Sequence, residues 1–207
     1  PRDGNNIIVI VHKDVTVILA RAFRGYRNIV ELICHEGVEK IEESAFFDCT
    51  SLRRVIMPGV TIVEQWAFYR CLALTDVECG KLERIKESAF RYCTSLRSIN
   101  LPSVEMVEGW AFRYCTALTV AKIGNKLRRI EERAFRDCLS LERITIPLKD
   151  GLITDDVFMG CENLKHVDLV RGALHETIDS LSSEDWRNDM NEEIESINQI
   201  LPNADAG

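Results

Sequence analysis

The sequence lacks any long apolar stretch. No segment of the chain approaches the ~18 consecutive apolar residues that a membrane-spanning helix needs. The run from Ile7 to Val11 is too short for the core of an export signal, and no small-residue cleavage site accompanies it. We therefore expect no membrane insertion.

An excess of positive charge is also missing. The 33 acidic side chains outnumber the 26 lysines and arginines, which gives a net charge of −7. The whole excess lies in residues 171–207, which carry nine acidic side chains and two arginines, so residues 1–170 are neutral. Phosphate backbones and anionic lipids attract positively charged surfaces. We therefore expect no nucleic-acid partner.

Catalytic and cofactor motifs are absent as well. The chain has no nucleophile elbow, no phosphate-binding glycine loop and no dinucleotide-binding loop, and none of its four histidines lies at metal-ligand spacing from another. The pairs Glu42-Glu43 and Glu131-Glu132 resemble the paired carboxylates of glycosidases. Equivalent repeat positions hold Glu64-Gln65 and Glu108-Gly109, so we interpret the pairs as a solvated ladder along one edge. We expect no enzymatic activity, no cofactor and no metal.

An internal repeat organises most of the chain. An Ala-Phe pair recurs six times and a Val-Phe pair once, so that the repeated phenylalanines are 22 or 23 residues apart: Phe23, Phe46, Phe68, Phe90, Phe112, Phe135 and Phe158. Three residues after each Phe stands a Cys, or Tyr26 in the first copy, and three residues further a Leu or Ile. A constant period of this length is typical of a solenoid, in which stacked units share one core.

The unit is clearest from Leu96 to Ala117. It reads Leu-x-x-Ile-x-Leu-Pro-x-Val-x-x-Val-x-x-x-Ala-Phe-x-x-Cys-x-x. The first segment predicts a short strand, which the proline ends because it has no backbone N–H to donate. A second short extended segment follows over Val104–Val107, and Gly109–Cys115 has room for one or two helical turns.

The proline after the strand and the Ala-Phe-x-x-Cys signature resemble the BspA-like subclass of leucine-rich repeats. The resemblance covers about residues 10–170. It implies an α/β leucine-rich-repeat solenoid of about seven repeats over residues 1–170, a curved stack of short parallel strands with short helical turns. It also implies adhesion or protein recognition, and no chemistry.

The eight cysteines have three possible interpretations. Six of them occupy one repeat position, and Cys34 and Cys79 replace the apolar residue that ends the strand elsewhere. This pattern favours reduced, buried thiols; some disulfide pairs or a metal site are the alternatives. No Cys-x-x-Cys sequence and no Asn-x-Ser/Thr sequon occurs. Reduced thiols favour an intracellular, cytoplasmic protein, and the cell surface is the alternative.

The outward side chains of the strands form a candidate protein-binding face. Side chains alternate along a strand, and the outward positions vary between repeats while the core positions do not. The candidate residues are Glu31, Arg54, Asp76, Glu78, Asn100, Lys122, Arg143, His166 and Asp168. An ordinary solvent surface would show the same variation. Trp66 and Trp110 precede the repeated Ala; they either anchor a partner or lie flat over neighbouring turns.

Residues 171–207 predict an acidic helical segment. The spacing of Leu174, Ile178 and Leu181 fits one helical stripe. A second helix is expected to start at Ser182 or Ser183 and to carry Trp186, Met190, Ile194, Ile197 and Leu201. These C-terminal helices either cap the last repeat or dock a partner or a second copy, and the oligomeric state stays open.

The resulting hypothesis is a non-catalytic scaffold that binds other proteins. The alternative is a cell-surface adhesion or carbohydrate-binding ectodomain. Oxidised cysteines or an export signal would favour the alternative.

Overall fold

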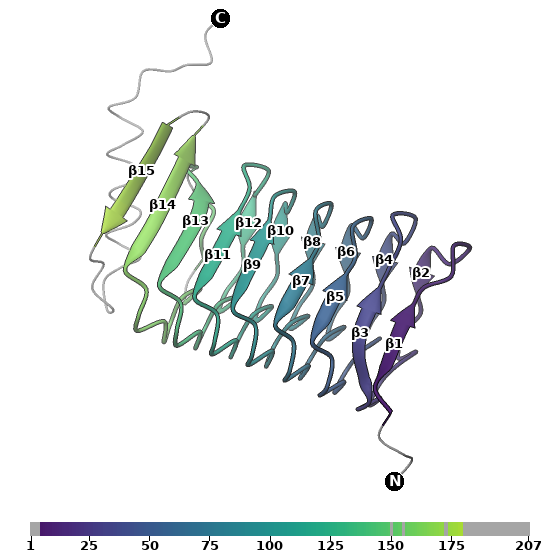
Figure 1. Cartoon of the computed structure of the whole chain (residues 1–207). Helices are drawn as coiled ribbons and strands as arrows, with labels where there is room; N and C mark the ends of the chain where they lie inside the picture. Colours follow the sequence, from purple (N-terminus) through teal and green to yellow (C-terminus); the bar gives the residue numbers. More distant parts are fainter. Residues whose placement is uncertain (1–4, 150, 155, 172–173, 180–207) are drawn as a thin grey trace, which may run out of the picture.

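The protein is a solenoid in which successive coils each make one turn around the long axis of the molecule (Figure 1). The computed structural model describes residues 5–149, 151–154, 156–171 and 174–179. Each coil consists of a long strand, a loop, a short strand and a tight turn segment. This arrangement confirms the parallel-strand leucine-rich-repeat solenoid expected from the repeat.

The long strands lie side by side and pair in parallel. They are β1 (Ile7–Ile10), β3 (Ile29–Ile33), β5 (Arg54–Ile56), β7 (Asp76–Glu78), β9 (Ser98–Leu101), β11 (Val120–Ile123), β13 (Arg143–Pro147) and β14 (His166–Arg171). They form two sheets, β1-β3-β5-β7 and β9-β11-β13-β14, and the second sheet also includes the antiparallel strand β15 (Leu174–Asp179) at its edge. Equivalent repeat positions face one another, as in the series Leu32, Val55 and Val77.

The short strands form one continuous sheet of six on the opposite side. They are β2 (Val17–Ile18), β4 (Lys40–Ile41), β6 (Ile62–Val63), β8 (Arg84–Ile85), β10 (Met106–Val107) and β12 (Arg129–Ile130). The second residue of each is buried. The two sets of strands therefore enclose one core that runs the length of the stack.

The repeated phenylalanines form the centre of this core. Their rings stack from coil to coil with centroids 5.0–5.6 Å apart, and those from Phe46 to Phe135 are fully buried. Large aromatic rings contribute strongly to core stability, and offset stacking adds to the burial term. One coil has no neighbour for its ring, so stability depends on stacking.

The expected helical turns are absent from the described residues. From Ser44 to Cys49, the even-numbered N–H groups donate to carbonyls of the following coil, and the odd-numbered ones donate to the carbonyl three residues back, at 2.8–3.2 Å. An α-helix would need every N–H to donate four residues back.

Left-handed residues cause this alternation. The residues directly before the repeated Ala and before the repeated Cys have φ values of 55° to 64° wherever they are not glycine. Such a conformation interrupts a right-handed helix and costs about 1–2 kcal/mol per residue. The turn segment is therefore a chain of tight turns, held by hydrogen bonds to the next coil.

The same hydrogen-bond geometry explains the cysteine row. Six thiols donate to the carbonyl oxygen of the repeated Phe in the preceding coil, with Sγ···O distances of 3.0–3.3 Å: Cys49, Cys71, Cys93, Cys115, Cys138 and Cys161. All eight cysteines are free and buried, which confirms the predicted burial. These six thiols therefore point toward backbone carbonyl groups, and Cys138 also forms a side-chain hydrogen bond with Cys161.

The C-terminal end of the described chain corrects a second expectation. Leu174–Asp179 is not a helix but the strand β15, which pairs antiparallel with β14. A spacing of four residues places two side chains on one face of either a helix or a strand, so Leu174 and Ile178 did not distinguish the two. The segment forms a strand because the edge of β14 offers it backbone hydrogen-bond partners. Leu181 and the second expected helix lie outside the described residues.

Within the described part of the chain, no helix is long and apolar enough to cross a membrane.

Candidate protein-binding face

The outward side chains of the long strands form a surface that we call the strand face. All nine candidate residues lie on it, in two rows set by the pairing register. One row contains Glu31, Arg54, Asp76, Arg143 and His166, and the other contains Glu78, Asn100, Lys122 and Asp168. The structure thus brings residues from seven repeats onto a single surface (Figure 1).

One arginine organises the acidic part of this face. Arg54 forms ion pairs with Glu31 at 3.8 Å, with Asp76 at 3.2 Å and with Glu78. The hydrogen bond that Arg54 donates to Glu78, together with the surrounding carboxylates, raises the pKa of the Arg54 guanidinium. Three carboxylates around one guanidinium leave this part of the face negative.

The other end of the face contains a tighter pair. Arg143 binds both carboxylate oxygens of Asp168, at 2.7 and 2.9 Å, and the Thr145 hydroxyl lies 3.5 Å from the same carboxylate. Asp168 is only 4% exposed. Bidentate pairs of this kind fix a side chain in place. Asp168 therefore holds Arg143 in position, and it is not the exposed contact residue that the alternation predicts.

Sequence reasoning missed an apolar strip beside the acidic cluster. Ile10, Ile33 and Ile56 face one another in register, and Ile8 lies opposite Glu31. Ile10 is 73% exposed and Ile8 53%. The sequence signal for this strip was the isoleucines at outward positions of the first long strands. Asn100 and Lys122, opposite each other on β9 and β11, are exposed in the middle of the face.

Trp66 and Trp110 lie on a different surface, the turn face, which consists of the tight turns around the repeated Ala and Phe. Both indoles are half-buried, and the Trp110 Nε1 is buried without a hydrogen-bond partner among the described residues. Ser44 and Ser88 occupy the same repeat position in the coils on either side of the Trp66 coil and are almost fully buried. Large and small side chains therefore alternate at this position along the stack.

Sequence reasoning also missed a row of rings and arginines on the turn face. The residue after each repeated Phe gives the series Arg24, Phe47, Tyr69, Arg91, Arg113, Arg136 and Met159. The Phe47 and Tyr69 rings stack at 4.8 Å, and the Arg24 guanidinium lies 4.4 Å above the Phe47 ring. The 22-residue period would have revealed this row.

The paired glutamates have a structural role. A carboxylate oxygen of Glu42, Glu108 and Glu131 accepts a hydrogen bond from a backbone N–H of the preceding coil, at 3.0, 3.2 and 3.3 Å respectively. They are half-buried, so the interpretation as a merely solvated ladder is wrong for these residues. Their recurrence follows from the need to satisfy an N–H group that no carbonyl reaches.

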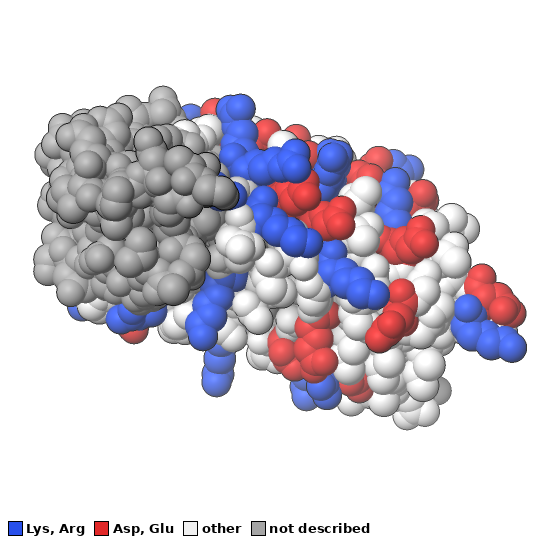
Figure 2. All heavy atoms as spheres, turned by 90° about the horizontal axis from the view of Figure 1, so that it is seen from above, with Lys and Arg blue, Asp and Glu red and all other residues white. Residues whose placement is uncertain are grey.

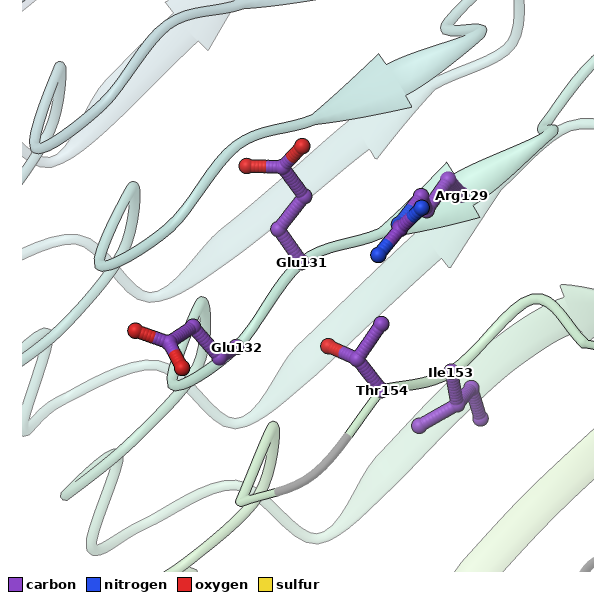
Figure 3. Close-up of a pocket in the computed structure, with 5 residues that line it drawn as sticks. All are labelled: Arg129, Glu131, Glu132, Ile153 and Thr154. Carbon is purple, nitrogen blue, oxygen red and sulfur yellow. The ribbon is translucent and has the colours of Figure 1, made fainter.

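The Glu131-Glu132 pair lines an open hollow of about 710 Å³ together with Arg129, Ile153 and Thr154 (Figure 3). The two glutamates project from one segment after β12 rather than facing each other across the hollow. Glu131 is engaged with the Gly109 N–H. This geometry does not resemble two carboxylates that flank a substrate.

Charges of both signs are mixed on the face of the stack that Figure 2 shows. Figure 2 shows lysines and arginines interspersed with aspartates and glutamates along the stack. Over the described ranges, no three His, Cys, Asp or Glu side chains gather in a group that would hold a metal ion. Burial raises the pKa of the Cys34, Cys49 and Cys79 thiols to about 12. These thiols are poor metal ligands and poor nucleophiles at neutral pH.

Comparison with known proteins agrees with this geometry. A family model described as BspA type leucine rich repeat region matches six copies, over residues 16–107 and 83–182. The comparison with curated proteins gives no match.

Solved structures of bacterial leucine-rich-repeat proteins are similar over most of the chain. A protein from Bacteroides ovatus is 30% identical with a TM-score of 0.70, over 81% of this chain and 42% of that one. The T. pallidum leucine rich repeat protein is 25% identical with a TM-score of 0.55, over 78% and 69%. A leucine rich cell surface protein from Faecalibacterium prausnitzii is 19% identical with a TM-score of 0.54, over 80% and 60%, which shows the fold alone.

This chain spans less than half of the Bacteroides ovatus structure. The repeat, the coil geometry and the match to the family model together show that the chain belongs to the BspA type leucine rich repeat family.

Proposed function

We propose that the chain is a non-catalytic protein-interaction module that binds its partner on the strand face. The observation that carries this proposal is the register of the long strands, which aligns variable side chains from successive repeats on one rigid sheet. A rigid surface loses little conformational entropy when it binds, so more of the contact energy contributes to affinity.

The chemistry of the strand face supports a protein partner. The apolar strip of Ile8, Ile10, Ile33 and Ile56 borders the acidic cluster around Arg54. Protein interfaces combine an apolar centre with a polar rim that supplies specificity. The face therefore suits a partner that has an apolar patch beside basic side chains. The net charge of this region does not suit nucleic acid.

The compartment is a separate question. The expectation of an intracellular protein gains no support from the comparisons, and the Faecalibacterium prausnitzii structure is described as a cell surface protein. Exposure on the cell surface is testable by protease treatment of intact cells, in which an exposed chain is cleaved and an internal one is protected.

Substitutions on the two sheets test the binding face. Lys122→Glu with Asn100→Arg changes the middle of the strand face, where both side chains are exposed. Arg84→Glu on the short strand β8 is the matched control, because Arg84 is exposed on the opposite sheet. Surface changes of this kind alter stability by about 0.5 kcal/mol or less.

Affinity capture from the source cells should recover partners with the parent chain and with the Arg84 variant. The strand-face variant should lose at least one of them. Recovery of the same partners by all three proteins would contradict the proposed binding face.

A further inference from the structure

The turn face contains a pocket of about 320 Å³ that no part of the proposed strand-face function uses. Its lining comes from four successive coils: Arg21, Arg24, Glu43, Ser44, Phe47, Trp66, Tyr69 and Arg91. The volume lies at the lower end of the roughly 300–1,000 Å³ range of ligand pockets. Three arginines and one glutamate give the lining an excess of positive charge, in a solenoid body whose charges otherwise balance.

Two of these arginines have no acidic partner. Arg21 forms an ion pair with Glu43 at 3.3 Å, which accounts for the single carboxylate of the pocket. Arg24 and Arg91 form no ion pair with any residue that the structure describes, and the Arg91 Nε is buried without a hydrogen-bond acceptor there. The nearby Asp48 carboxylate is already engaged with Arg27 and Arg70, at 2.9 and 3.2 Å.

The aromatic rings hold the two unpaired guanidinium groups in place. Arg24 lies 4.4 Å above the Phe47 ring, and Arg91 lies 5.1 Å from the centroid of Tyr92 and 6.0 Å from that of Tyr69. A guanidinium stacked on a ring keeps donors at its edge and needs little further ordering to bind a carboxylate with two hydrogen bonds. The two arginines are therefore preorganised donors.

The rings themselves favour an anion over a neutral sugar. The Phe47 and Tyr69 rings stack face to face at 4.8 Å, and Arg24 covers the outer face of Phe47. A neutral sugar would stack on an open ring face, whereas Arg24 and Tyr69 already pack on the Phe47 ring. The guanidinium groups that pack beside these rings attract a negative group instead.

The geometry points to a second binding site, in which Arg24 and Arg91 bind two carboxylates of an acidic segment of a partner protein. Arg24 and Arg91 belong to coils three steps apart, which corresponds to about 14 Å at ~4.8 Å per strand spacing. An extended peptide advances ~3.4 Å per residue, so acidic side chains four residues apart span about the same distance and point to the same side.

The same repeat position provides a matched control further along the stack. Arg113 and Arg136 both lie beside Asp137, at 3.4 and 3.3 Å, so each of them already has an acidic partner, unlike Arg24 and Arg91. Arg113→Gln with Arg136→Gln removes the same amount of charge from the turn face as Arg24→Gln with Arg91→Gln. Only the second pair of substitutions removes the proposed carboxylate donors.

The test is fluorescence anisotropy of the full chain with three labelled probes. The first is an extended peptide with two glutamates four positions apart, the second has glutamines instead, and the third is a hyaluronan oligosaccharide. We expect the glutamate peptide to bind and the glutamine peptide to bind at least about tenfold more weakly. Raising the salt concentration from about 0.05 M to about 0.5 M should weaken the binding.

The double variant at Arg24 and Arg91 should lose at least about tenfold in affinity, and the variant at Arg113 and Arg136 should retain the affinity of the parent. Arg24→Gln alone removes an exposed side chain and should give a smaller loss without affecting folding. Absence of binding to the glutamate peptide, or an equal loss in both double variants, would overturn the site. Tighter binding of the oligosaccharide would overturn the assignment to a protein segment. Either result leaves the strand face untouched.

Discussion

Replacing Phe90 with alanine tests whether the stacked rings hold the solenoid together. Phe90 is fully buried, and its ring lies 5.1 Å from Phe68 and 5.3 Å from Phe112, nearly parallel to both. Truncation of a buried phenylalanine costs about 3–5 kcal/mol, because it removes buried surface and leaves a cavity. Two lost ring pairs, at about 0.5–1.5 kcal/mol each, form part of this cost.

A loss of this size is a large part of the stability of a typical domain, which is about 5–15 kcal/mol. For a chain of this length it corresponds to a decrease in Tm of roughly 6–20 °C. The stability of a solenoid is approximately a sum of unit and nearest-neighbour terms. The coils that contain Phe68 and Phe112 should therefore lose stability together with the substituted coil.

Thermal melting followed by circular dichroism measures the decrease, and urea unfolding gives the free energy independently. Phe23→Ala is the matched control, because Phe23 is only half-buried and stacks on a single repeated ring, that of Phe46, at 5.0 Å. We expect its cost to be roughly half of that at Phe90. If Phe90→Ala melts within a degree or two of the parent, or costs no more than Phe23→Ala, the stacked rings do not carry the stability assigned to them.

Three further predictions concern close approach, protonation and the end of the stack. Gly124→Ala would place a Cβ 2.1 Å from a backbone oxygen of the preceding coil, whereas a Cβ at Gly80, at the equivalent repeat position, would meet open space. Urea unfolding should show a marked loss of stability for Gly124→Ala and little loss for Gly80→Ala. Similar losses for the two variants would contradict the close contact at Gly124. Burial raises the pKa of seven of the eight thiols. The folded state therefore keeps protons that thiols of the unfolded chain, with a pKa of ~8.5, release at high pH. The unfolding free energy should fall by up to about 1.4 kcal/mol per thiol per pH unit between about pH 8.5 and 10, and it should show no such slope below pH 7. Mild labelling at neutral pH should modify few thiols, and labelling in urea nearly all, whereas an intact mass lacking pairs of hydrogens would reveal disulfides. Truncation after Leu181 keeps β15, whereas truncation after Val170 leaves the edge of β14 unpaired. The shorter chain should aggregate, as measured by light scattering. Equal solubility of the two truncated chains would show that β15 does not protect the edge.

The strand positions were predictable because a 22–23-residue period repeats the same constraints in every coil. The repeated Leu, Ala, Phe and Cys had to be buried together, and the alternation along each strand then placed Arg54, Asn100 and Lys122 on the outer surface. Two expectations about local conformation were wrong for a common reason. Spacings of three and four residues suit a helix, yet the turn residues and Leu174–Asp179 form hydrogen bonds to neighbouring coils instead.

The sequence by itself determined the repeat, the family and the composition of the core, because these depend on which residues must be buried together. Tertiary structure decided what depends on contacts between coils. Asp168 is buried although the strand alternation places it outward, and Arg143 from the preceding coil compensates its charge. The stack of Arg24, Phe47, Tyr69 and Arg91 exists only because equivalent positions of four coils lie next to one another. Hydrogen bonds between distant segments replaced the local ones that a helix would have used, and no local pattern in the sequence specifies that choice.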